Sequence, residues 1–172
     1  MGGMAIKTAF IEPMLLLRME RLPVGSEFVH EHKLDGYRSL AVKTEGRVHL
    51  RSGNDKDFNA KYPCLVNALG DMPDETVLDG EVVALDADGR PSFNILLNYA
   101  AGLPLHYLIF DLLLLKGRDV MGEPLMKRRE LIEEHVLVGQ FEFVEWTQDQ
   151  HLRHSRFVGL REDKKTKDVR RE

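Results

Sequence analysis

The sequence predicts an α+β protein that is built mainly on antiparallel β-sheet. Strand-like and helix-like segments follow one another without the regular strand–helix–strand alternation that is typical of parallel sheets. Turns containing glycine join several strand-like runs directly, and a short turn between neighbouring strands makes them antiparallel. The 172 residues have a formal net charge of −4 and are 43% hydrophobic. These proportions fit a globular protein and exclude an extended disordered chain.

The first predicted element is a three-stranded meander. Asp35-Gly36 is a strong signal for a tight turn, and Glu45-Gly46 supplies a second turn. The three runs of strand-like composition that these turns separate lie at residues 27–33, 37–43 and 47–51. The following residues, 52–62, are polar and are expected to form a loop.

A short helix is expected on each side of the next predicted strand. Pro63 can open a helix that ends near Gly70. Residues 76–86 predict a strand that ends in the turn Asp86–Gly89. Ser92 is placed to cap a further short helix that reaches Tyr99.

The C-terminal third contains the clearest predicted helix. The continuous apolar run Tyr107–Leu115 predicts a strand that is buried on both faces, within which Asp111 needs a partner. The segment Leu125–His135, after a proline, predicts an amphipathic helix. Strand candidates at residues 141–146 and 156–160 follow it.

The sequence argues against a membrane-spanning protein and against a secreted one. The longest nearly apolar run is too short to cross a bilayer, and no N-terminal stretch has the order of a secretory signal. Cys64 is the single cysteine, so an internal disulfide cannot form. We therefore expect a cytoplasmic protein without a membrane partner.

Charge is distributed unevenly along the chain. Residues 151–172 contain eight basic and four acidic side chains, a net charge of +4, which leaves −8 for residues 1–150. A basic segment favours a phosphate-bearing partner. A solvated, frayed terminus is the alternative interpretation.

The most informative stretch is residues 31–38. If its strand pattern holds, Glu31 and Lys33 project to one face, and the turn returns Arg38 beside them. Such a cluster is either a surface group of ion pairs or a lysine nucleophile, whose attack requires the neutral amine. The residue types alone leave both interpretations open.

The pattern Glu-x-Lys-x-Asp-Gly-x-Arg at residues 31–38 resembles motif I of the covalent nucleotidyltransferases, which include ATP-dependent DNA ligases and mRNA capping enzymes. Further stretches agree in order: residues 78–84 resemble motif III, residues 107–112 motif IIIa, and residues 156–164 motif VI. Residues 118–134 are similar to bacterial ATP-dependent ligases of the end-joining type.

The resemblance implies a role for individual residues. Lys33 is the implied catalytic residue, which attacks the α-phosphate of ATP and forms a lysyl-AMP intermediate. The implied nucleotide-binding residues are Glu31 at the adenine, Asp35, Gly36 and Arg38 around the sugar and phosphates, Glu81 at the ribose, and Phe110 stacked on the base. Arg161 and Lys164 are implied to contact the pyrophosphate. Without the motif, Phe110 would be assigned to ordinary core packing.

The implied reaction joins nicks in double-stranded DNA. AMP passes from Lys33 to a 5′-phosphate, and the 3′-hydroxyl then closes the break. ATP and a divalent metal such as Mg²⁺ are the implied cofactors, and end-joining or repair proteins are the implied partners. The metal ligands are unknown, because His30 and His32 share a predicted strand face but no third ligand accompanies them at a recognisable spacing.

Two motifs of the family are missing from the chain. Between His135 and Phe141 there is neither a Glu-Gly-x-x-x-Lys segment (motif IV) nor a Trp-x-Lys-x-Lys segment (motif V), which in the family hold the metal and the α-phosphate. We therefore expect a truncated adenylation domain over residues 10–136, followed by the C-terminal strands of an OB-fold over residues 137–172. Ligase activity is expected to be impaired. The alternatives are a catalytically inactive ATP- or DNA-binding remnant of a ligase, or a degenerate reading frame without a cellular role.

Overall fold

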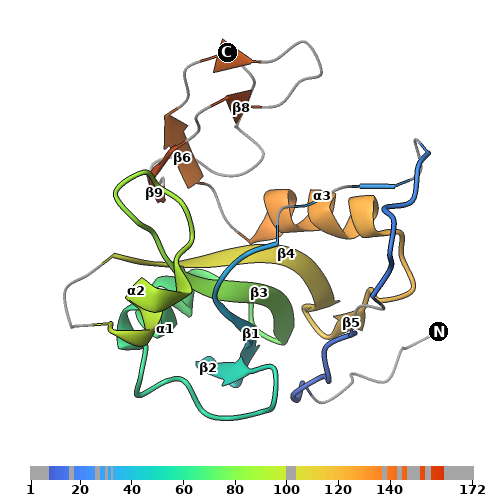
Figure 1. Cartoon of the computed structure of the whole chain (residues 1–172). Helices are drawn as coiled ribbons and strands as arrows, with labels where there is room; N and C mark the ends of the chain where they lie inside the picture. Colours follow the sequence, from blue (N-terminus) through green and yellow to red (C-terminus); the bar gives the residue numbers. More distant parts are fainter. Residues whose placement is uncertain are drawn as a thin grey trace.

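The computed structural model describes residues 8–15, 18–25, 28–29, 31, 33–99 and 104–136, together with the backbone of four short C-terminal strands. Its centre is a five-stranded sheet, shown in Figure 1. The strands of this sheet are β1 (Tyr37–Thr44), β2 (Arg47–Ser52), β3 (Thr76–Ala84), β4 (Leu105–Leu115) and β5 (Arg118–Asp119). They lie in the order β2-β1-β3-β4-β5, and every neighbouring pair is antiparallel. The predicted α+β class with an antiparallel sheet is confirmed.

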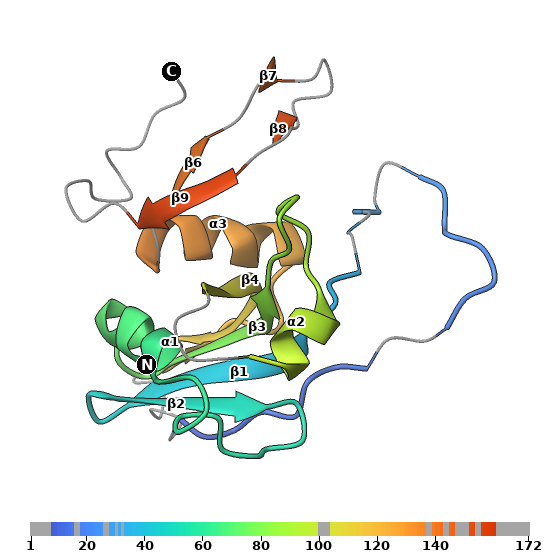
Figure 2. The same cartoon turned by 60° about the vertical axis from the view of Figure 1, so that its left-hand side comes forward.

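Helices connect and cover the strands. They are α1 (Pro63–Ala68), which continues as the 3-10 helix η1 (Leu69–Asp71), then α2 (Phe93–Leu97) and α3 (Leu125–His135). The bounds of α3 agree with the sequence prediction, and α3 packs along β4 (Figure 2). None of the helices in the described ranges is long and apolar enough to cross a membrane.

The C-terminal strands pair among themselves. They are β6 (Gly139–Glu142), β7 (Glu145–Trp146), β8 (Leu152–Arg153) and β9 (Arg156–Leu160). β6 pairs with β9, and β7 pairs with β8, in both cases antiparallel. The proposed division into domains at residues 136 and 137 stays a prediction.

The predicted strand at residues 27–33 is wrong. Of this stretch the structure describes residues 28, 29, 31 and 33, and all four lie outside helices and strands. Strand β1 is hydrogen bonded to β2 along one edge and to β3 along the other. Because a strand has only two such edges, β1 has no edge left for a preceding strand. Residues 33–36 instead form a loop that enters β1.

The two faces of the sheet are covered by different parts of the chain. Side chains of one face, including Ala41, Leu78 and Val82, belong to the larger core, to which α1 and α2 contribute Leu65 and Leu96. On the other face Leu40, Val42, Val77, Leu113 and Leu114 form a smaller cluster, against which Phe10 and Ile11 of the N-terminal segment pack. Arg38 and Glu81 alternate with the same period as this second set, so they belong to the second face.

Strand β4 is less buried than its sequence predicts. Residues 112–115 are buried, whereas residues 105–111 are only half-buried. The half-buried part includes residues that border a cavity, which an apolar run in the sequence does not reveal. Asp111 has the partner that its position requires, because Arg128 of α3 donates to both of its carboxylate oxygens at 2.7 and 2.8 Å.

Candidate active site

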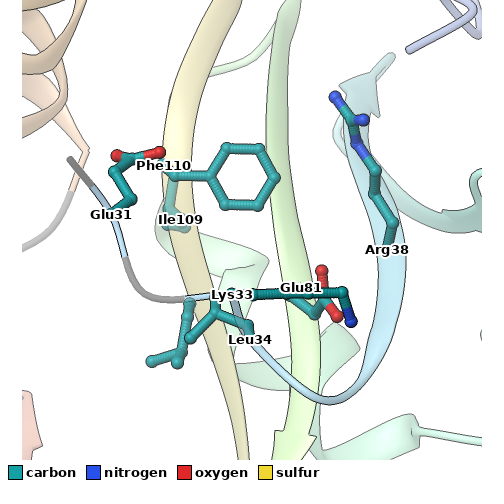
Figure 3. A pocket seen from close by; sticks show the side chains of 8 residues that line it. Glu31, Lys33, Leu34, Arg38, Glu81, Ile109 and Phe110 are labelled. Carbon is teal, nitrogen blue, oxygen red and sulfur yellow. The ribbon is translucent and has the colours of Figure 1, made fainter. Parts of the chain in front are cut away.

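A cavity of about 530 Å³ lies beside the second face of the sheet. Its volume is within the range that is usual for small-molecule sites. Figure 3 shows the side chains that line it, which come from the loop before β1 and from three strands. They are Glu31, Lys33 and Leu34 from the loop, Arg38 from β1, Glu81 from β3, and Leu108, Ile109 and Phe110 from β4. Five of the residues singled out by sequence therefore meet at one cavity.

Lys33 and Glu81 line the same part of the cavity. In Figure 3 the side chain of Lys33 extends toward the carboxylate of Glu81. Glu81 is the one residue of β3 that is not buried, although the strand around it is. Partial burial raises the pKa of Glu81, while the Gly36 N–H and the positive charges of Lys33 and Arg38 oppose that rise. A lysine amine and a half-buried carboxylate acceptor thus share one wall.

Gly36 holds the loop against β3. Its N–H donates to Glu81 Oε1 at 3.0 Å. A Cβ atom at this position would lie 2.2 Å from the carbonyl oxygen of Val82 and 2.8 Å from Val83 Cγ1. Only glycine therefore permits this approach, which places Lys33 over the sheet.

Arg38 is fixed by a nearly buried carboxylate. Its Nε and Nη2 donate to the two oxygens of Asp79 at 3.1 and 2.7 Å, and Nη1 donates to the carbonyl of Met14 at 2.7 Å. The Asp79 hydrogen bonds raise the pKa of Arg38 against the effect of burial. The guanidinium carbon lies 5.6 Å from the centroid of Phe110, so the aromatic ring and a cation line the same side. The sequence analysis missed Asp79, for which the only signal was an acidic residue inside an apolar strand.

Phe110 and Glu31 border the cavity on the side of α3. In Figure 3 the ring of Phe110 lies between Glu31 and Arg38. The Glu31 carboxylate is ion-paired with Arg129 of α3, which also donates from Nε to the Phe110 carbonyl at 3.2 Å. Sequence reasoning did not single out Arg129 as a site residue, because the contact spans 98 residues.

Asp35 lies outside this lining. Its carboxylate accepts a hydrogen bond from the Phe93 N–H at 3.0 Å, at the start of α2. Ser92 is the N-cap residue of α2, as predicted, but its side chain makes no capping hydrogen bond. The side chain that accepts a hydrogen bond at the start of α2 therefore belongs to a loop residue 58 positions away in the sequence. The expected contact of Asp35 with the sugar stays a prediction.

The remaining candidates are not placed by the structure. Arg161, Lys164, His30 and His32 lie outside the described residues. Among the residues that are described, no three His, Cys, Asp or Glu side chains come together as a metal site. Magnesium usually binds through one or two carboxylates together with substrate phosphates, so a nucleotide-borne ion does not require such a cluster.

Residues 13–157 match the family of the ATP-dependent DNA ligase domain. The chain is also similar to multifunctional non-homologous end joining proteins LigD. One from Mycobacterium bovis is 41% identical over 110 residues, which cover 63% of this chain and 14% of the relative. One from Pseudomonas aeruginosa is 36% identical over 136 residues, which cover 77% and 16%. The SPbeta prophage-derived DNA ligase-like protein LigB of Bacillus subtilis is 29% identical, and the match covers 72% of this chain and 46% of that protein. The chain thus spans less than half the length of these relatives.

Solved structures give the same fold. The crystal structure of the ligase domain from Mycobacterium tuberculosis LigD aligns with a TM-score of 0.54 and 41% identity, over 59% of this chain and 33% of that one. A mycobacterial DNA ligase D complexed with ATP and MES aligns over 83% of this chain and 91% of that one, also with a TM-score of 0.54. At 22% identity, the second similarity bears on the fold alone.

Proposed function

The chain belongs to the ATP-dependent DNA ligase domain family, and from this premise we propose that its cavity binds ATP and that Lys33 accepts AMP. The chain is a partial, ligase-like domain. One observation supports the proposal most strongly: the amine of Lys33 borders the same cavity as the carboxylate of Glu81, the guanidinium of Arg38 and the ring of Phe110. These are an amine nucleophile, an acceptor for hydroxyl groups, a fixed cation and a surface for base stacking.

The proposed first step is a displacement at the α-phosphorus of ATP. The neutral amine of Lys33 forms a nitrogen–phosphorus bond, the bond to the β-phosphate oxygen breaks, and pyrophosphate leaves while the nitrogen loses a proton. Arg38, held by Asp79, offers a preorganised positive charge beside the phosphates. In this proposal Glu81 accepts from the ribose hydroxyls, and the hydrogen bond from the Gly36 N–H orients its carboxylate. A bound Mg²⁺ would neutralise charge on the phosphates.

We propose that this step is slow in the chain by itself. The sequence lacks motifs IV and V, which in the family hold the metal and the α-phosphate. Among the residues that line the cavity, Lys33 and Arg38 are the cations. Loss of a single preorganised stabiliser of transition-state charge typically reduces a rate by about 10²–10³. Loss of several such groups therefore predicts strongly impaired adenylation.

The later steps of the proposed reaction involve DNA and its repair proteins. AMP would pass to the 5′-phosphate of nicked double-stranded DNA, and the 3′-hydroxyl would close the break. Repair or end-joining proteins are the expected partners of such a step.

We propose a cytoplasmic location on the basis of the single cysteine, Cys64, which is exposed.

A second candidate function is a catalytically inactive module that binds nucleotide or DNA. It is favoured by the missing motifs and by the net charge of +4 in residues 151–172. This alternative predicts DNA binding that weakens steeply with salt and never accompanies a covalent adduct, because phosphate contacts dominate such binding.

Titration calorimetry with ATP in EDTA tests the nucleotide site without allowing adenylation. Phe110→Ala should weaken ATP binding about tenfold or more, because a base–aromatic stack contributes about 1–3 kcal/mol. Phe28, an exposed aromatic outside the cavity lining, supplies the matched control, and Phe28→Ala should leave affinity unchanged. Equal ATP affinity of the wild type and Phe110→Ala would show that the base does not stack on Phe110.

A further inference from the structure

We propose that Arg129 of α3 is a positioning residue that sets the base preference of the cavity, by holding Glu31 at its rim. The inference rests on the proposed function, because it assumes that the occupant is a nucleotide. It assigns a specificity role to a side chain outside the cavity lining. The contact of Glu31 with adenine is implied by the family resemblance, and the inference adds the residue that holds Glu31 in place.

Arg129 joins two parts of the cavity wall that are far apart in the sequence. Its Nε donates to the carbonyl oxygen of Phe110 at 3.2 Å, and its Nη2 contacts Oε1 of Glu31. Both Phe110 and Glu31 line the cavity. One guanidinium therefore fixes a carboxylate relative to the strand whose aromatic ring is proposed to stack on the base.

Glu31 needs such an anchor because its own segment provides little. It lies outside helices and strands, and its side chain is 50% exposed. An exposed glutamate samples many rotamers, and fixing it opposes its conformational entropy. The planar fork of an arginine loses less freedom per hydrogen bond than a lysine would.

Helix α3 is itself held firmly against the sheet. The neighbouring Arg128 donates to both oxygens of Asp111 and to the carbonyls of Met121 and Glu123. The side chains of Arg128 and Asp111 are only 15% and 17% exposed. Since α3 is anchored one residue away, the side chain of Arg129, 25% exposed, starts from a fixed backbone position.

Between the residues that the structure describes, the hydrogen bond of the Glu31 side chain uses one of its two carboxylate oxygens. Arg129 contacts Oε1, and we assign the second oxygen, Oε2, to the base. An ionised carboxylate only accepts hydrogen bonds. A C6 amine donates to it, whereas a C6 oxo group presents a second acceptor and is disfavoured. A fixed carboxylate therefore distinguishes the two purines, and an untethered one can turn away from either.

ATP and inosine triphosphate (ITP) are the matched probes, because their heavy atoms differ only in the substituent at C6, with one hydrogen added on N1 of ITP. Titration of the full chain in EDTA should show a preference for ATP of about tenfold, as expected for a hydrogen bond to a charged group. Arg129→Met should reduce that ratio to near one, mainly through weaker ATP binding. Arg129→Lys, which keeps the charge and loses the fork, should give an intermediate ratio.

Lys127→Met supplies the matched control. Lys127 is an exposed cation on the same helix, paired with Glu130, and it does not line the cavity. This variant should keep the wild-type ratio of ATP to ITP affinity. If Arg129→Met also keeps the wild-type ratio, or if Lys127→Met loses it equally, the role of Arg129 is overturned while the nucleotide site stands. A wild-type chain that binds neither nucleotide overturns the proposed function, and the inference with it.

A second variant covers the case in which Arg129→Met does not fold. Glu31→Gln offers the base both a donor and an acceptor and should lower the ratio on its own. In that background, Arg129→Lys should cause no further change, because the two residues act through one contact. A further fall in the ratio would show that Arg129 acts by another route and would contradict the proposal.

Discussion

Glu81 shows how the proposed chemistry affects stability at a single residue. Partial burial raises its pKa above the ordinary value of 4.5, so the folded chain disfavours the ionised form. A raised carboxyl pKa contributes stability below the unfolded-state pKa, and that contribution is lost as the pH rises through the folded-state pKa. At neutral pH the ionised side chain therefore destabilises the fold, while it offers two acceptors to the proposed ligand.

Glu81→Gln should separate these two effects. The glutamine keeps an acceptor for the Gly36 N–H, and it removes the half-buried charge. We expect a higher melting temperature than the wild type at pH 7, with the difference vanishing below pH 4.5, where both side chains are neutral. Thermal unfolding followed by circular dichroism across this range measures the difference. A gap that is independent of pH would contradict the assignment to ionisation.

Tyr62 offers a second prediction at the scale of one atom. The residue is fully buried, and in the described part of the chain its hydroxyl is the one buried side-chain polar atom without a hydrogen-bond partner. Tyr62→Phe should stabilise the chain by about 1 kcal/mol, because an unsatisfied buried hydroxyl is destabilising. Chemical denaturation at pH 7 measures this change.

The pH dependence of the same variant has a defined sign. Burial raises the pKa of Tyr62 to about 12, ahead of smaller effects from Tyr37 and Tyr99. The wild type should therefore lose stability as the pH rises above the ordinary value of 10, and the phenylalanine variant should lose less. If the stability advantage of Tyr62→Phe over the wild type became smaller above pH 10, this prediction would be contradicted.

At the scale of elements, the contact between the Lys33 loop and β3 depends on Gly36. Gly36→Ala should destabilise the chain by about 3 kcal/mol and weaken ATP binding, because its Cβ would overlap the backbone oxygen of Val82, which cannot move without breaking the sheet.

Gly70→Ala is the matched control, because nothing lies within 4 Å of a Cβ at that position. It should leave both stability and binding near the wild-type values. The two variants can be compared by urea denaturation and ATP titration under identical conditions. Equal stability of the two would show that the loop does not press on β3.

Local patterns in the sequence predicted the elements that depend on local interactions. Helix α3 and strand β9 have the predicted bounds, because periodicity and composition determine them. The strand expected at residues 27–33 failed for a non-local reason: β3 occupies the edge of β1 that it needed. The cap position of α2, Ser92, was predicted, whereas the hydrogen bond from the Phe93 N–H was not, because Asp35 reaches it from a distant loop.

At the site too, local sequence motifs predicted some residues, and residues that depend on distant contacts were missed. A motif of eight residues and two later stretches predicted five of the eight residues that line the cavity, namely Glu31, Lys33, Arg38, Glu81 and Phe110. Asp35 of the same motif lies outside the lining. The residues that hold the lining side chains, Asp79 and Arg129, were missed because their contacts span 41 and 98 residues. Pairings of that separation depend on the sheet order and on the docking of α3.

At the scale of the whole molecule, the chain carries the proposed nucleotide site on a sheet of its own. The second face of that sheet is covered in part by Phe10 and Ile11, and Met14 supplies a carbonyl to Arg38. The N-terminal segment thereby supports the same face on which the cavity lies. The sequence lacks motifs IV and V, which would complete the proposed phosphate site.

The extent of Lys33 adenylation tests this account most directly. The full chain is incubated with ATP and Mg²⁺, and its intact mass is followed over time beside that of Lys33→Ala. We predict that the mass increases by one AMP in only a small fraction of wild-type chains after hours, and in none of the Lys33→Ala chains. Rapid and stoichiometric addition of AMP to the wild type, or an adduct that persists in Lys33→Ala, would contradict the account.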